Sequence, residues 1–206
     1  MKLVSLTIAI SLLTACSSNP MQPNWISLQN TDQFTDKTTC TVTTGSFYSG
    51  GSIYTLSNHY YPYIAKVDSE IFVGIQSGGK IKMPVGIIQL RIDTNTAWTI
   101  TTAETPLLST NVNVNYQNMP YPENISDEQK KVFDATYKTA MDNVAKGMSP
   151  FTATTGDKAH KILSEMLTGN KLIYRTVGLN QAASTTGEIT LDGSLKTALG
   201  QCGISL

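Results

Sequence analysis

Long hydrophobic runs are absent from the sequence beyond its first sixteen residues. A membrane-spanning helix needs about 20 consecutive apolar residues, so we expect no later segment to cross a bilayer. Charged residues are also scarce, at 15% of the chain, against about 25% in a typical soluble domain. The formal net charge is +0 and no block of basic residues occurs, which argues against nucleic-acid binding.

Motifs that carry metal or catalytic chemistry are missing as well. The two histidines, His59 and His160, belong to no His-Glu-x-x-His pattern, and the sequence has no Cys-x-x-Cys or Gly-x-Ser-x-Gly motif. Asp93, Glu104 and Glu188 are candidates for a pair of carboxylates that cleaves glycosides, but the sequence does not bring any two of them together. We therefore expect no metal ion and no cofactor, and we favour a binding role over an enzymatic one.

The amino terminus, in contrast, carries an export signal. A short positive start, Met1-Lys2, precedes an uncharged, mostly apolar stretch from Leu3 to Leu13, whose length suits the apolar region of a signal peptide. The stretch ends in Leu13-Thr14-Ala15-Cys16, which resembles the lipobox of bacterial lipoproteins. The resemblance implies cleavage before Cys16, a diacylglycerol on its thiol and an acylated new amino terminus. An ordinary secretory signal, with Cys16 following Ala15 by chance, is the alternative.

The lipobox predicts how the chain is organised. Residues 1–15 are expected to be the signal peptide and residues 16–35 a lipidated tether, with Trp25 near its first contact with the domain. Residues 36–206 are expected to form one globular domain outside the cytoplasm. Two or three acyl chains hold a protein stably at a membrane surface without a spanning helix. Ser17, after the lipidated cysteine, resembles the pattern that sorts lipoproteins to the outer membrane.

Only two further cysteines remain, Cys40 and Cys202. An exported protein reaches a compartment that permits disulfides, so we expect these two residues to pair. The bond would close a loop over nearly the whole domain, and the chain-entropy model gives roughly 5 kcal/mol for such a loop before strain is subtracted. Two free thiols or a metal pair are the alternatives, but the second would need further His or Cys neighbours.

Alternating apolar residues predict a mainly antiparallel sheet. Thr38–Thr44 is expected to be a strand that carries Cys40, residues 52–56 a second strand, and residues 70–98 a three-stranded meander. In its second strand the apolar residues point to one face and the polar ones to the other. The apolar face consists of Ile88, Leu90 and Ile92, and the polar face of Gln89, Arg91 and Asp93.

Helices are predicted in the second half of the chain. Ser126 and Gln129 form a capping box, and an apolar stripe of helical spacing follows it: Phe133, Tyr137, Ala140, Met141 and Val144. A second helix is expected over residues 157–167, strands over 171–177 and 187–191, and a last helical turn capped by Ser194. Together these elements predict an α+β domain, with two to three helices packed on one face of the sheet and one disulfide.

Three pieces of the sequence resemble the invasion-associated locus B group of exported β-rich domains. These are Gln89-Leu90-Arg91-Ile92-Asp93, Tyr174-Arg175-Thr176-Val177 and the carboxyl-terminal residues 187–202. Members of the group end a strand in Arg-x-Asp and carry a late cysteine on a short helix. The resemblance covers about a third of the chain, gives residues 126–167 no counterpart, and implies an exported β-rich domain with a Cys40–Cys202 link but no catalytic residue.

Two surfaces are candidates for binding. The first is an aromatic loop with flat rings and polar tips, made of Tyr54, His59, Tyr60, Tyr61 and Tyr63. Its alternative is a set of rings that pack over a sheet edge. The second is the polar strand face that carries Arg91 and Asp93, and its alternative is an ion pair between these two residues. We expect a membrane-anchored, non-enzymatic module that binds an envelope protein or the cell wall. An inhibitor or immunity protein against a periplasmic enzyme and an envelope hydrolase are the alternatives.

Overall fold

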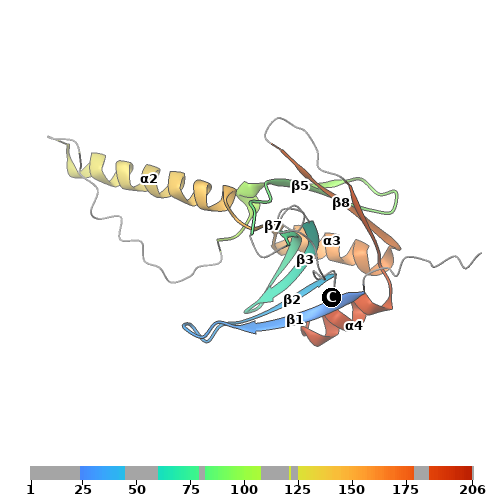
Figure 1. The fold of residues 1–206 in the computed structure, drawn as a ribbon. Coiled ribbons are helices and arrows are strands. Elements are labelled where there is room, and N and C mark those ends of the chain that lie inside the picture. The colour runs from blue at the N-terminus through green and yellow to red at the C-terminus, as the bar shows by residue number, and fades with distance from the viewer. Residues whose placement is uncertain are drawn as a thin grey trace, which may run out of the picture.

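The computed structural model describes residues 24–44, 60–78, 82–107, 121, 125–178 and 186–205 (Figure 1). The lipobox with Cys16, the strand expected at 52–56, Tyr54 and His59 lie outside these residues. The five-stranded sheet has the order β1 (Trp25–Thr31), β2 (Thr38–Thr44), β3 (Tyr60–Val67), β4 (Glu70–Ser77) and β7 (Phe151–Thr154). The four-stranded sheet has the order β6 (Trp98–Ile100), β5 (Ile87–Ile92), β8 (Lys171–Val177) and β9 (Gly187–Thr190). The helices are η1 (Thr102–Glu104), α2 (Asp127–Gly147), α3 (Gly156–Thr168) and α4 (Gly193–Gln201).

All strand pairs are antiparallel. One apolar core joins the inner faces of both sheets to α3 and α4, because successive residues of a strand point to opposite faces. The five-stranded sheet supplies Val42, Ile64, Val73 and Ile75, and the four-stranded sheet supplies Ile88, Leu90, Ile92 and Leu172. Ile162, Leu163 and Met166 of α3 and Leu195 and Leu199 of α4 complete this core. The α+β class with antiparallel strands and helices is thus confirmed.

The predicted disulfide is present between Cys40 of β2 and Cys202, which follows α4. Their Cα atoms are 5.4 Å apart and their sequence separation is 162 residues. A second link lies beside the bond, since Lys66 Nζ donates to the Gly203 carbonyl over 2.6 Å. The carboxyl terminus is therefore fastened to the middle of the five-stranded sheet.

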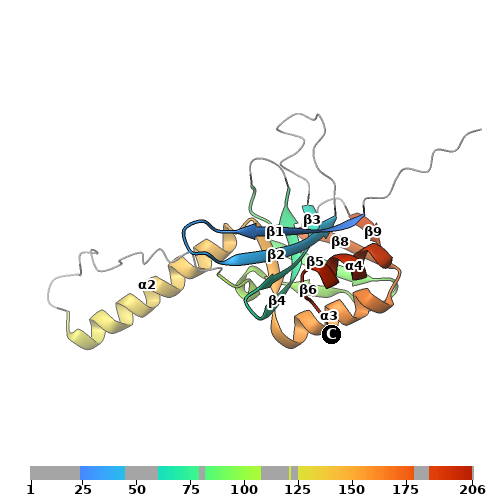
Figure 2. The same cartoon turned by 90° about the horizontal axis from the view of Figure 1, so that it is seen from below.

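The domain begins earlier than the sequence indicated. Trp25–Thr31, which we expected to belong to the tether, is β1 and pairs along its whole length with β2 (Figure 2). Trp25 is only 3% exposed, and its indole Nε1 donates to the Thr190 carbonyl over 2.9 Å. Its backbone N–H donates to Ser194 Oγ over 3.1 Å. The strand was missed because, after Trp25, its residues lie on an edge and are mostly polar.

The meander predicted over residues 70–98 is wrong in its first strand. β5 and β6 pair as expected, but β4 pairs with β3 and β7 and belongs to the other sheet. The chain leaves β4 at Ser77, whose N–H donates to the Pro150 carbonyl. It then turns at Gly86, where φ is +74°, before β5 begins. This turn lets β4 and β5 belong to different sheets.

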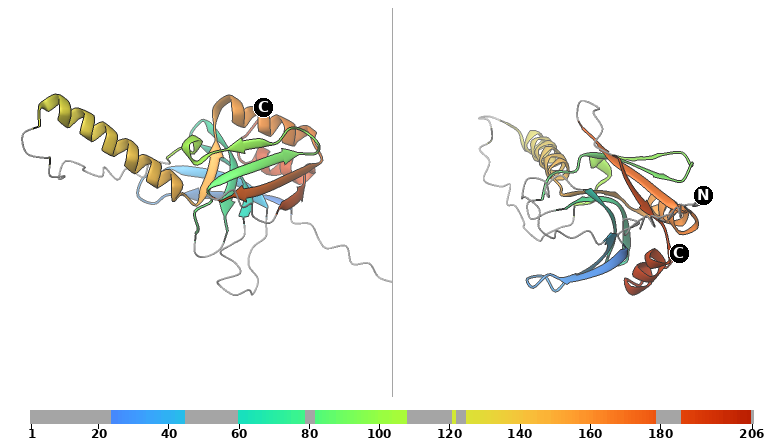
Figure 3. Two further views of the ribbon diagram at one scale, coloured as in Figure 1. Left: turned by 90° about the horizontal axis from the view of Figure 1, so that it is seen from above. Right: turned by 45° about the vertical axis from the view of Figure 1, so that its right-hand side comes forward.

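Helix α2 has the predicted cap but not the predicted packing. Ser126 Oγ accepts the Gln129 N–H and Gln129 Oε1 accepts the Ser126 N–H, as a capping box requires. No residue of α2 is buried, and the helix projects from the two sheets (Figure 3). Its carboxyl end is held by Lys146 Nζ, which donates to the Ala103 carbonyl over 2.7 Å. Only α3 and α4 therefore pack on the sheets as expected.

Two details of the helices complete the fold. Helix α4 is capped by Asp192 and not by Ser194, because the Asp192 carboxylate accepts the Ser194 N–H over 2.9 Å. Hydrogen bonds from the side chain and backbone of Ser194 lower the pKa of Asp192, although slight burial opposes them. None of the described helices is long and apolar enough to cross a membrane.

Candidate functional site

The aromatic segment is mostly part of the fold. Tyr60, Tyr61 and Tyr63 lie in β3, not in a loop. Tyr63 is 5% exposed, its ring centroid lies 5.1 Å from that of Phe151, and burial raises its pKa to about 12. Tyr60 packs against the main core, and Tyr61 is half-buried. Tyr60 and Tyr63 thus pack within the fold, although on the faces of a central strand and not over a sheet edge.

The polar face of β5 carries the second predicted site. Asp93 follows β5 with a positive φ of 48°, and its carboxylate accepts the N–H groups of Asn170 and Lys171 over 3.0 and 2.9 Å. It thereby fixes the turn between α3 and β8. Arg91 donates elsewhere, from Nε to the Asn95 carbonyl over 3.0 Å and from Nη2 to the Thr94 carbonyl over 3.1 Å. The predicted alternative, an ion pair between Arg91 and Asp93, does not form.

Strand pairing brings a second arginine to Arg91. In the register of β5 and β8, Arg91 lies opposite Ile173 and Gln89 lies opposite Arg175. The two arginines are diagonal neighbours on one face, a relation that places Cα atoms about 7–8 Å apart. They are the only arginines of the sequence. Arg175 Nε donates to Gln89 Oε1 over 2.7 Å, so the amide of Gln89 holds this guanidinium in place.

A shallow pocket of about 250 Å³ lies on this outer face of the four-stranded sheet. Its walls combine two guanidinium groups, one amide, one hydroxyl and aliphatic side chains. They include Gln89, Arg91, Ala97, Ile173, Arg175 and Thr186. We call this set the arginine pocket. It offers hydrogen-bond donors, positive charge and an apolar floor, which together suit a small anionic group that carries an apolar part.

The positive charge of the arginine pocket is not neutralised from within the described residues, where neither guanidinium forms an ion pair. Three carboxylates on neighbouring elements are engaged elsewhere. Asp93 binds backbone N–H groups, and Glu165 accepts from Asn95 Nδ2 over 3.1 Å and from Trp98 Nε1 over 3.2 Å. Glu188 pairs with Lys171 over 3.2 Å. A site with two uncompensated charges in a chain of zero net charge favours an anionic ligand.

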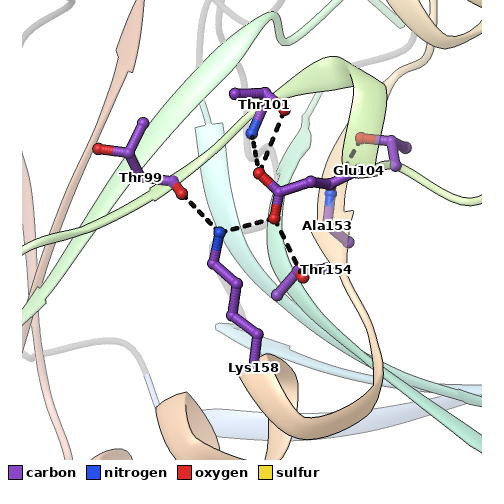
Figure 4. A network of polar contacts seen from close by, with 7 residues as sticks. Thr99, Thr101, Glu104, Ala153, Thr154 and Lys158 are labelled. Atoms are coloured by element: carbon purple, nitrogen blue, oxygen red, sulfur yellow. Dashed lines mark hydrogen bonds and ion pairs between the residues drawn. The ribbon is translucent and has the colours of Figure 1, made fainter.

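A second polar cluster has a structural role (Figure 4). Lys158 Nζ of α3 lies 2.6 Å from Glu104 Oε2 and donates to the Thr99 carbonyl over 2.7 Å. Glu104 Oε1 accepts the Thr101 N–H over 3.1 Å, and Oε2 accepts from Thr154 Oγ1 over 3.4 Å. Partial burial alone would raise the pKa of Glu104. Hydrogen bonds from Lys158 and Thr101, together with the charge of Lys158, outweigh this effect, so the pKa of Glu104 lies below its ordinary value. The cluster joins β6, η1, β7 and α3.

The three carboxylates considered for glycoside cleavage thus have different partners. Asp93 holds a turn, Glu104 binds Lys158, and Glu188 pairs with Lys171. His160, the histidine within the described residues, is an exposed residue of α3. Within the described residues, no group of three or more His, Cys, Asp or Glu side chains could hold a metal ion.

Sequence reasoning found two of the six residues that define the arginine pocket. Gln89 and Arg91 were recognised from the alternation of β5, but Arg175, Ile173 and Ala97 were not assigned a role. Alternation within residues 171–177 could have placed Ile173 and Arg175 on one face. The pairing of β8 with β5 could not be inferred from this alternation.

No protein-family model, curated protein or solved structure matches the chain.

Proposed function

We propose that the protein is a lipid-anchored module of the bacterial envelope that binds an envelope protein or a cell-wall partner through the arginine pocket. The observation that carries the proposal is that Arg91 and Arg175 lie as diagonal neighbours on an exposed sheet face, without a carboxylate partner among the described residues. Arginine is enriched at binding surfaces because its planar head makes several hydrogen bonds at once.

The lipobox supports the anchored part of the proposal. Cys16 would carry the lipid, and β1 begins at Trp25. The eight intervening residues reach at most about 30 Å when fully extended. The domain would therefore work close to the membrane surface, and a partner would have to come within this short reach. Tethering also raises the effective concentration of the module near such a partner, so weak contacts suffice.

The test is co-purification of the full-length, membrane-anchored protein after mild chemical cross-linking in cells. The variant Arg91→Gln/Arg175→Gln removes both guanidinium groups from an exposed face, so its thermal midpoint should match that of the wild type. We expect it to lose the partners that the wild type recovers. Lys196→Gln is the matched control, because it removes one positive charge from the exposed side of α4. Equal recovery from wild type and double variant would contradict the proposal.

A further inference from the structure

We infer that the arginine pocket binds a side-chain carboxylate of an acidic peptide, and that Arg175 holds this carboxylate end-on. The inference rests on the proposed function and specifies the chemistry of the partner. Three features support it: the guanidinium nitrogens that are already occupied, the aliphatic residues that line the pocket, and the elements from which the lining comes.

Arg175 has the geometry for a bidentate contact. Its Nε is occupied by Gln89 Oε1 at 2.7 Å. Among the described residues, its two terminal nitrogens have no hydrogen-bond partner. The end of the guanidinium therefore presents two parallel N–H groups, which match the two oxygens of a carboxylate. Gln89 acts as a positioning residue, because its amide sets the direction in which this fork points.

Arg91 has a different arrangement. Its Nε and Nη2 donate to the carbonyls of Asn95 and Thr94, and no other described residue occupies Nη1, which can therefore bind a ligand. Arg91 can thus give one hydrogen bond and a fixed positive charge, but no second fork of the kind at Arg175. Together, the two arginines fit a ligand that places one carboxylate on Arg175 and a second acidic group or a carbonyl near Arg91. Two neighbouring acidic residues of a peptide provide this arrangement.

The rest of the pocket favours a peptide over a phosphate group. Ile173 and Ala97 line it with aliphatic surface, which suits the methylene groups of a glutamate side chain. Phosphate sites in proteins are commonly built from backbone N–H groups at a helix amino terminus or in a glycine-rich turn. The described lining comes chiefly from strands β5 and β8, with no helix. Attraction to an anionic bilayer typically needs a cluster of four to eight basic residues, and none of the described residues that line this pocket is a lysine.

The experiment is a titration of the isotope-labelled, lipidated protein in neutral detergent micelles, followed by the backbone amide signals of β5 and β8. The probe is an acetylated and amidated peptide with two adjacent glutamates. The comparison ligands are the same peptide with glutamines and inorganic phosphate. We expect saturable shifts at Gln89, Arg91, Ile173 and Arg175 with the glutamate peptide. The glutamine peptide and phosphate should bind at least tenfold more weakly.

Variants identify the contact. Arg175→Gln should weaken glutamate-peptide binding at least tenfold, and Arg175→Lys, which keeps the charge but loses the fork, should weaken it several-fold. Gln89→Ala should weaken it less than Arg175→Gln, and Lys196→Gln should leave it unchanged. The unshifted signals of the other strands show that each variant is folded. Equal binding of the glutamate and glutamine peptides, tighter binding of phosphate, or unchanged binding by Arg175→Gln would overturn the inference.

The inference and the proposed function can fail separately. If the glutamate peptide does not bind but Arg91→Gln/Arg175→Gln still loses its cellular partner, the pocket is a binding site of different chemistry. If the glutamate peptide binds and the same variant keeps all its partners, the pocket takes carboxylates but the proposed function is wrong.

Discussion

Arg175 and Gln89 lie directly opposite each other on two adjacent strands, with Nε of the arginine 2.7 Å from Oε1 of the glutamine, although 86 positions separate them in the sequence. The pairing of β5 with β8 creates this contact and places Arg91 one diagonal step away. The site is thus a product of the sheet and not of any local motif. Its components can be changed one at a time, because they lie on the exposed face.

The disulfide should contribute strongly to stability. Cys40→Ala/Cys202→Ala removes a link across 162 residues, and loss of a native disulfide from a small exported domain costs about 2–5 kcal/mol of unfolding free energy. Denaturant unfolding of the oxidised wild type and the double variant measures the difference. Mass spectrometry of non-reduced peptides should show Cys40 joined to Cys202. Two free thiols in the purified protein would contradict the assignment.

Glu104 should make stability depend on acidic pH. Its pKa is lowered in the folded protein, so its contribution is fully present above the pKa of the unfolded chain and is lost as pH falls through the lower, folded value. Glu104→Gln should therefore reduce the unfolding free energy at pH 7 by about 1 kcal/mol, a modest figure because solvent screens this partly exposed pair.

The difference between wild type and Glu104→Gln should shrink when unfolding is repeated at decreasing pH below 4. Thr139→Ala, a change on the exposed side of α2, is a control that should show no such pH dependence. A difference that stays constant down to pH 2 would mean that the charge of Glu104 does not stabilise the fold.

Tyr63 should behave as a core residue and not as a binding residue. It is 5% exposed and packs on Phe151, so Tyr63→Ala should cost about 3 kcal/mol or more, as is typical of buried aromatic residues. Phe34, which is 99% exposed, provides the matched aromatic control, and its replacement by Ala should change stability by less than about 0.5 kcal/mol. A Tyr63→Ala variant with wild-type stability and weakened partner binding would restore the aromatic site.

The apolar residues of α2 should contribute little to folding. Val132 is 66% exposed and Val144 is 58% exposed, so replacing both with Ser should change the unfolding free energy by less than about 1 kcal/mol. Leu163 of α3 is fully buried, and Leu163→Ala should cost about 2–5 kcal/mol. Thermal unfolding followed by circular dichroism compares the two variants. A large loss from the α2 variant would show that this helix is packed in solution.

Local pattern predicted much of the fold, and its failures have physical reasons. Ser126 and Gln129 identified the start of α2 because a capping box involves neighbouring residues. The exposure of Val144 was not foreseen, since an apolar stripe shows that a helix is amphipathic but not whether anything covers it. Trp25 was assigned to the tether because most of the other residues of β1 are polar. Its partners Thr190 and Ser194 lie at the other end of the chain.

The candidate site was predicted only in part for a similar reason. Alternation placed Arg91 on the polar face of β5, but it carries no information about which strand lies beside β5. Only that pairing brings Arg175 and Ile173 into the same pocket. The aromatic segment was wrongly expected to be a loop, and the reason again lies in the sheet. Tyrosine is a common residue at exposed binding surfaces, so Tyr60 and Tyr63 suggested a contact site. Because β3 is a central strand, Tyr60 packs on one of its faces and Tyr63 on the other.

The anchor can be tested by itself. Cys16→Ser removes the thiol to which the lipid would be attached, so the variant should not incorporate a fatty acid. Metabolic labelling with a clickable fatty acid, followed by gel fluorescence, measures this incorporation. The control variant is Cys40→Ser, which replaces a cysteine outside the lipobox and should still be labelled. Labelling of Cys16→Ser at the level of the wild type would contradict the lipoprotein proposal.

The most direct measurement of the central claim is site-specific photo-cross-linking in cells that express the full-length protein. A photoreactive residue at Ala97, in the wall of the arginine pocket, should give a discrete cross-linked product. The same residue at Phe34, fully exposed in the turn between β1 and β2, should not. The product at Ala97 should disappear in Arg91→Gln/Arg175→Gln. No product at Ala97, or one that survives removal of both arginines, would contradict the account.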